Sequence, residues 1–168
     1  MKQTSTSPQN ANTIDATVII HRRVEEVFGF YRDFRNLPHF LGDVTTVDEI
    51  GHGTSRWTIQ GPLGIAVNWT VWVTEERPNE LIRYETVTAP ILTTCWRIHF
   101  AIGSAANMTV VREVMQAPFG LLGRAALALL GKHPAEEVAS NLRRLKELLE
   151  TGRVADRSYA VTGKFPPH

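Results

Sequence analysis

The chain has 168 residues, a formal net charge of +1, 43% hydrophobic residues and 21% charged residues, as is typical of a soluble globular protein with one buried core. A charge so close to zero, without a dense run of Lys and Arg, argues against binding to nucleic acid. The single cysteine, Cys95, excludes an internal disulfide and a Cys-rich zinc site. No His, Asp or Glu spacing indicates a metal site, and we expect no cofactor.

The start of the chain, MKQTSTSPQNANT, is polar and lacks the apolar region of a secretory signal. No stretch approaches the roughly 18 apolar residues that a membrane-spanning helix needs. We therefore expect a cytoplasmic protein whose residues 1–13 form a disordered tail.

A strand and two short helices are predicted next. Residues 15–20 include a β-branched run that favours a strand. Residues 22–34 have apolar side chains at helical spacing, which predicts an amphipathic helix. A turn and a second short helix are expected over residues 36–41, ending at Gly42.

From Val44 onward the apolar residues recur every second position, which is the period of a half-buried strand. Short turns rich in Gly, Pro and Asn separate these stretches, so we expect an antiparallel meander with one apolar and one solvated face. The predicted strands cover residues 44–50, 56–60, 66–76, 81–87, 93–102 and 108–116.

Residues 134–151 predict a long helix of about 18 residues with one apolar stripe. Pro134 suits its first turn, and Gly152 suits a C-terminal cap. A stripe of this length needs an apolar surface to pack against. Because the rest of the chain is mostly predicted strands, we expect that surface to be a curved sheet. We expect an α+β domain over residues 14–152, with about seven antiparallel strands wrapped around the long helix and two short helices between strands 1 and 2. Residues 153–168 are expected to form a flexible tail.

This order of elements resembles the helix-grip fold of the START/birch-pollen-allergen superfamily, and more narrowly the SRPBCC proteins known as polyketide cyclase/dehydrase or lipid-transport proteins. The resemblance covers residues 14–152. The segments that carry it are Val27-Phe28, Asn36-Leu37-Pro38-His39-Phe40, Arg56-Trp57-Thr58-Ile59 with Gly61-Pro62-Leu63-Gly64, Asn68-Trp69, Glu76-Arg77-Pro78-Asn79, and the helix end from Leu145 to Gly152.

The resemblance implies an apolar cavity between the concave face of the sheet and the long helix. The flat surfaces of aromatic side chains on that face suit an aromatic or polyene ligand, and the alternative is that these side chains simply fill the interior. The residues expected to line the cavity are Trp57, Ile59, Trp69, Val71, Ile82, Tyr84, Thr86, Thr94, Trp96, Ile98, Phe100 and Leu142.

Polar candidates for catalysis are few. Tyr84 could donate a hydrogen bond to a ligand carbonyl or act as an acid, and it could also be purely structural. The alternation of the last strand does not decide whether Arg112 or Glu113 points inward. A lone buried charge would be costly and would indicate function. Either residue, if it points inward and lies within hydrogen-bond reach of Tyr84, would favour an enzyme.

The expected function is binding of a hydrophobic small molecule, such as a lipid, a quinone or a polycyclic, polyketide-like compound, by a carrier or binding protein. The alternative that the resemblance implies is a polyketide cyclase/dehydratase acting on a poly-β-keto or related substrate. A protein-interaction module using the outer face at Trp72, Arg97 and His99 is a third hypothesis. The oligomeric state is left open.

The apolar segment 119–131 has two interpretations. By resemblance it passes the mouth of the cavity, where it could act as a lid or make a transient contact with a membrane. It could also be a buried turn and helix that cap the core. Exposure of Leu63, Ile91 and Leu92 on the same side would favour the membrane contact.

Overall fold

The computed structural model describes residues 13–61, 64–87, 93–116 and 133–165. The order of elements in this part of the chain is the predicted one: strand, helix, short helix, six strands, long helix. The elements are β1 (Thr13–Ile20), α1 (Val24–Arg32), the 3₁₀ helix η1 (Phe34–His39), β2 (Val44–Gly51), β3 (Thr54–Gln60), β4 (Ala66–Arg77), β5 (Leu81–Val87), β6 (Thr93–Ile102), β7 (Thr109–Gln116) and α3 (Pro134–Thr151).

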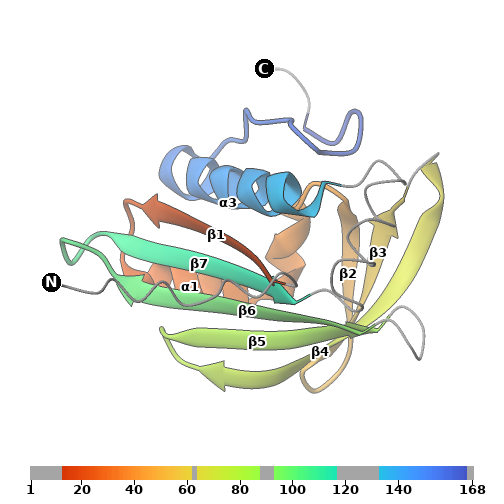
Figure 1. Cartoon of the computed structure of the whole chain (residues 1–168), viewed down its shortest axis with the longest axis horizontal. Coiled ribbons are helices and arrows are strands. Elements are labelled where there is room, and N and C mark those ends of the chain that lie inside the picture. Colours follow the sequence, from red (N-terminus) through yellow and green to blue (C-terminus); the bar gives the residue numbers. More distant parts are fainter. Residues whose placement is uncertain (1–12, 62–63, 88–92, 117–132, 166–168) are drawn as a thin grey trace, which may run out of the picture.

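The seven strands form one antiparallel sheet in the order β1-β7-β6-β5-β4-β3-β2. Six strands follow one another as a meander, and β1 closes the series by pairing with β7. The sheet curves strongly, and α3 lies along β1 above it (Figure 1). The predicted α+β helix-grip architecture, with two short helices between β1 and β2, is therefore confirmed.

The two faces of the sheet follow the alternation of apolar and polar residues in the sequence. In β7 that alternation did not decide which side chains point inward, and strand pairing does. Val111 of β7 lies opposite Val18 on one side and Phe100 on the other. Phe100 and Val111 are buried in the main core cluster. Since side chains two apart share a face, Glu113 points inward with Val111, whereas Arg112 is exposed.

The helix α3 begins and ends where the sequence predicts. Pro134 occupies its first turn, and Gly152 ends it with φ of 75°, a left-handed conformation that glycine adopts without strain. Its apolar stripe packs into the interior through Val138, Leu142 and Leu145, which are at most 2% exposed.

Residues 153–165, for which a flexible tail is expected, lie along the side of α3 that faces away from the strands (Figure 1). The backbone N–H of Val161 donates to the Gly42 carbonyl, and Lys164 Nζ donates to the carbonyls of Leu41 and Val44. A Cβ atom at Gly42 would lie 2.7 Å from the Tyr159 carbonyl oxygen, so this close approach requires glycine. The domain boundaries themselves stay a prediction.

A charged cluster joins the end of β1 to the last turns of α3. Glu150 Oε1 accepts hydrogen bonds from the His21 backbone N–H at 2.7 Å and from Lys146 Nζ at 2.6 Å, and it lies 2.9 Å from His21 Nδ1. Partial burial by itself disfavours the charged carboxylate. The hydrogen bonds from Lys146 and His21 outweigh that effect and lower the pKa of Glu150 to about 2.

Glu150→Gln is expected to lower the free energy of unfolding at pH 7 by about 1–2 kcal/mol, because the cluster is only partly shielded from solvent. The unfolded chain binds this proton near pH 4.5, so the wild-type advantage exists above that pH and declines as the pH falls toward 2. Urea unfolding of the wild type and of Glu150→Gln at pH 7, 5 and 3 measures this difference in stability. The control is Glu136→Gln, exposed in the first turn of α3. An equal loss in both variants would contradict a specific role of Glu150.

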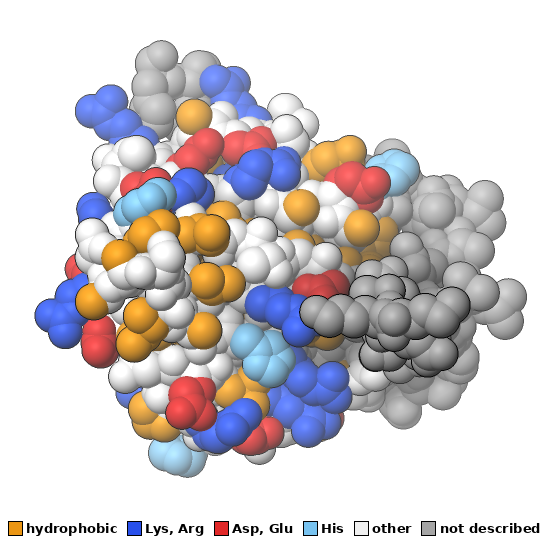
Figure 2. All heavy atoms as spheres, turned by 60° about the vertical axis from the view of Figure 1, so that its left-hand side comes forward, with side chains coloured by type: hydrophobic (Ala, Val, Ile, Leu, Met, Phe, Trp, Pro, Cys, Tyr) orange, Lys and Arg blue, Asp and Glu red, His pale blue; other side chains and the backbone are white. Residues whose placement is uncertain are grey.

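The surface mixes both signs of charge with scattered apolar side chains, as the face in Figure 2 shows. None of the helices in the described part of the chain is both long and apolar enough to span a membrane. The predictions for segment 119–131, for Leu63, for Ile91 and Leu92 and for the N-terminal tail concern residues outside the described ranges.

Candidate functional site

The inner face of the sheet is the face that packs against α1 and α3, and it gathers most of the predicted ligand-lining residues. They lie mainly in the core cluster that also contains Leu145. Buried there are Trp57, Ile59, Val71, Ile82, Tyr84, Ile98, Phe100 and Leu142, with Thr86 buried beside them. Trp69, Trp96 and Thr94 are only partly buried. The packing therefore fills one part of the interior and leaves some inner side chains partly accessible.

Four aromatic rings form a continuous aromatic wall, which we define as Phe34, Trp57, Tyr84 and Trp96. Phe34 meets Trp57 edge-on at 5.4 Å and Tyr84 at 5.3 Å between ring centroids. Trp96 stacks on Tyr84 at 6.0 Å with an angle of 11° between the planes. These contacts hold the rings at set angles and present flat apolar surfaces.

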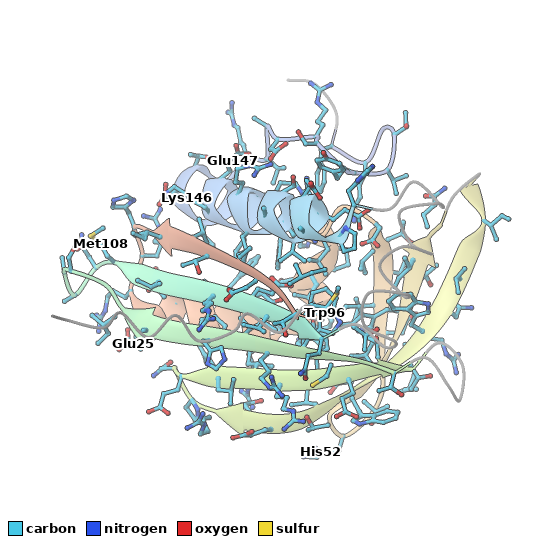
Figure 3. All side chains as sticks on the ribbon, in the orientation of Figure 1. Glu25, His52, Trp96, Met108, Lys146 and Glu147 are labelled. Carbon is cyan, nitrogen blue, oxygen red and sulfur yellow. The ribbon has the colours of Figure 1, made fainter. Side chains whose placement is uncertain are left out.

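Trp96 marks where this wall approaches the long helix. It packs against a second small cluster that contains Val138 of α3. In Figure 3 it lies at the end of the strands below the first turns of α3, whereas Lys146 and Glu147 lie toward the other end of that helix. The partly exposed end of the wall is thus near the start of α3.

Glu113 is the only acidic side chain that the described residues bury in the interior. It is 1% exposed, and its Oε2 atom has no hydrogen-bond partner in the described ranges. Its register neighbours are Ile98 of β6 and Ala16 of β1, which carry no charge. Burial therefore raises the pKa of Glu113 to about 8, and the carboxyl is mostly protonated at neutral pH.

Two tyrosines lie close enough to Glu113 to respond to its charge. Burial, and then the charge of Glu113, raise the pKa of Tyr31 and the pKa of Tyr84 well above the ordinary value, so both remain neutral phenols. The two hydroxyls also influence each other, but the Tyr31 hydroxyl meets no partner at normal hydrogen-bonding geometry. The group Glu113, Tyr31 and Tyr84 is called the inner acid group below.

The indole N–H groups of the inner tryptophans differ in their hydrogen bonding. Trp57 Nε1 donates to Ser55 Oγ at 2.8 Å, so its polar atom is satisfied. The Nε1 atoms of Trp69 and Trp96 are buried and have no hydrogen-bond partner among the described residues. An unpaired buried donor costs free energy, which a ligand or a water molecule with an acceptor oxygen would recover.

The two charged candidates of β7 lie on opposite faces of the sheet. Arg112 lies on the outer face, where its Nε atom is 3.0 Å from both carboxylate oxygens of Asp15. It is therefore part of a surface ion pair and not of the interior. Arg97 and His99 are partly buried and alternate with the inward Trp96 and Ile98 along β6, as predicted for outer-face residues.

Sequence reasoning did not single out two members of this site. The helix predicted over residues 22–34 contains both Tyr31 and Phe34, whereas α1 ends at Arg32 and Phe34 begins η1. Tyr31 is the one polar side chain in that stripe of Val24, Val27 and Phe28, and this was the available signal. No sequence signal could have shown that Phe34 contacts Tyr84, because that contact depends on where η1 meets the sheet.

The arrangement offers two chemical capabilities. The aromatic wall can hold a flat apolar molecule by stacking and dispersion. The inner acid group offers neutral proton donors in a site with little water, where hydrogen bonds to a polarised oxygen are strong.

Comparison with known proteins bears on the fold and the family of this chain. Among solved structures, proteins from Deinococcus radiodurans (22% identity, TM-score 0.64) and Thermus thermophilus (19%, 0.65) each cover 83% of this chain and are themselves 98% covered. A START superfamily protein from Mycobacterium smegmatis has 14% identity and a TM-score of 0.62, covering 82% of this chain and 98% of its own. At these identities the likeness shows the fold alone. No curated protein sequence matches. Residues 12–150 match the family described as polyketide cyclase/dehydrase and lipid transport, and the chain therefore belongs to that family.

Proposed function

We propose that this protein binds a hydrophobic small molecule between the inner face of its sheet and α3, as a carrier or binding protein. One observation carries the proposal: Trp69 and Trp96 face the interior, stay partly accessible and keep indole N–H groups that pair with none of the described residues. A fully packed core would leave neither the surface nor the donors unused. A lipid, a quinone or a polycyclic compound would suit such a surface.

The inner acid group favours a second candidate function, a cyclase or dehydratase acting on a poly-β-keto or related substrate. Glu113 points inward, and its charge acts on Tyr84. A protonated carboxyl and two phenols could protonate or polarise a substrate carbonyl. The side chains around the inner acid group are closely packed, so such a reaction requires the substrate to displace some of them.

Native mass spectrometry of the full chain purified from cells, followed by extraction, tests the binding function. We expect a co-purifying apolar mass, and we expect Trp96→Ala to lose it while the outer-face variant Trp72→Ala keeps it. Trp72 is a matched control because it is a tryptophan of the same sheet, on β4, whose side chain is exposed. An empty protein that also fails to quench its tryptophan fluorescence with hydrophobic probes would contradict the proposal.

Tyr84→Phe separates the carrier from the enzyme. The substitution removes one hydroxyl and keeps the ring that stacks on Trp96. For a carrier held by aromatic contacts, we expect affinity for the extracted ligand to change by less than about threefold, because a single neutral hydrogen bond contributes little net free energy. For an enzyme that uses the phenol as an acid, turnover should fall by about 100-fold or more.

A further inference from the structure

Within the part of the chain that the structure describes, four buried polar groups of the interior have at least one atom without a protein partner, and we call them the inner donor group. Its members are Trp69 Nε1, Trp96 Nε1, the Tyr31 hydroxyl and the Glu113 carboxyl. They come from four separate elements, β4, β6, α1 and β7, that meet around one core. Unpaired buried polar atoms are rare in native proteins, and four in one interior require an explanation.

The members of this group are chiefly donors. An indole N–H can only donate a hydrogen bond. The Glu113 carboxyl is mostly protonated at neutral pH, because burial raises its pKa to about 8, so it can donate as well. A phenol both donates and accepts. A ligand that pairs with these groups must therefore supply hydrogen-bond acceptors.

The inner residues also disfavour an anionic ligand. The described inner residues include no Lys, Arg or His that could neutralise an anion, since Arg112 is on the outer face with Asp15. The buried Arg144 is engaged elsewhere, with the carbonyls of Phe40 and Ser158. A carboxylate ligand would lose its hydration without gaining a counter-ion, and it would repel Glu113 whenever Glu113 ionises.

We infer that the ligand of this site is a neutral, flat molecule bearing carbonyl-type acceptor oxygens that pair with the inner donor group, and that fatty acids and other carboxylates are excluded. The inference rests on the proposed function and narrows its ligand class. The aromatic wall requires the flat shape, because stacking on Trp96 continues the stack that Trp96 forms with Tyr84.

Three naphthalene probes of similar size test the inference on the wild-type full chain. They are 2-acetylnaphthalene, which has one neutral acceptor oxygen, 2-ethylnaphthalene, which has none, and 2-naphthoate, which is an anion. Tryptophan quenching at pH 6.5 gives the three dissociation constants. We expect the ketone to bind about fivefold more tightly than the hydrocarbon, and the carboxylate to bind at least about tenfold more weakly than the ketone.

Variants then show which indole N–H donates to the ketone oxygen of the probe. Trp96→Phe keeps a ring and removes the donor, so it should reduce the preference for the ketone over the hydrocarbon to near unity, whereas the outer-face control Trp72→Phe should leave it unchanged. Loss of preference in Trp69→Phe instead would place the oxygen at Trp69. Unchanged preference in both inner variants would overturn the assignment to indole donors.

A pH series adds a readout that a structural role would not change. The titratable groups that act on Glu113 from the described elements around it are Tyr31 of α1 and Tyr84 of β5, both neutral throughout. The preference for the ketone should therefore shrink between pH 6.5 and 9.5 as Glu113 loses its donor proton. In Glu113→Gln, whose amide keeps a donor at every pH, the preference should persist.

The outcomes separate the two proposals. Binding of the hydrocarbon or of the carboxylate as tightly as the ketone overturns this inference and leaves the proposed function standing. Failure of all three probes to bind contradicts the proposed function, and the inference falls with it.

Discussion

Glu113→Gln is expected to make the protein more stable at pH 9 by roughly 5 kcal/mol. Folding places this carboxyl in an interior that disfavours its ionised form, and its pKa rises from an ordinary 4.5 to about 8. The unfolded chain thus releases the proton near pH 4.5, while the folded chain retains it until about pH 8. Between these values the folded state binds more protons, so wild-type stability falls as the pH rises.

Glutamine has nearly the same shape and no proton to lose, so its stability should not show this decline. Urea unfolding of both proteins at pH 4.5, 6, 7.5 and 9 measures the effect. We expect the two proteins to agree within about 1 kcal/mol at pH 4.5, where the wild-type carboxyl is neutral in the folded state, and to diverge above it. Parallel curves over the whole range would show that Glu113 is solvated or paired in the folded protein.

Arg144→Leu is expected to lower the free energy of unfolding by about 3–5 kcal/mol. The Arg144 side chain is 0% exposed, and its guanidinium donates to the carbonyls of Phe40 and Ser158, both at 2.7 Å, and to Asn141 Oδ1. It therefore ties α3 to the end of η1 and to the C-terminal segment. Leucine would fill some of the volume but would leave these acceptors without a donor.

Arg143→Leu is the matched control. Arg143 is the preceding residue of the same helix, but its side chain is about half exposed and bonds Asp156 at 2.9 Å. Exposed ion pairs contribute little, so its loss should cost no more than about 1 kcal/mol. Hydrogen exchange should show faster exchange over residues 153–165 in Arg144→Leu than in Arg143→Leu. A buried charge can be replaced without cost in some proteins, and wild-type stability of Arg144→Leu would place this protein among them.

The order of elements could be predicted almost completely from the sequence. Strand and helix periods differ, and residues such as Gly51, Pro78 and Gly152 stand where the chain turns or a helix ends. The inward positions of Trp57, Tyr84 and Ile98 followed from alternation alone, because one face of each strand is distinctly more apolar. These features are local, so a short window of sequence contains them.

The tertiary structure decided what local patterns could not. In β7 both alternating sets contain valines, so only pairing with Val18 and Phe100 showed that Glu113 is buried. Arg144 of α3 is buried, and its guanidinium donates to the Ser158 carbonyl of the segment that covers this side of the helix. Tyr31 approaches Glu113 only because α1 packs on the inner face. Fold class thus came from hydrophobic period, whereas the site came from contacts between residues distant in sequence, which periodicity does not record.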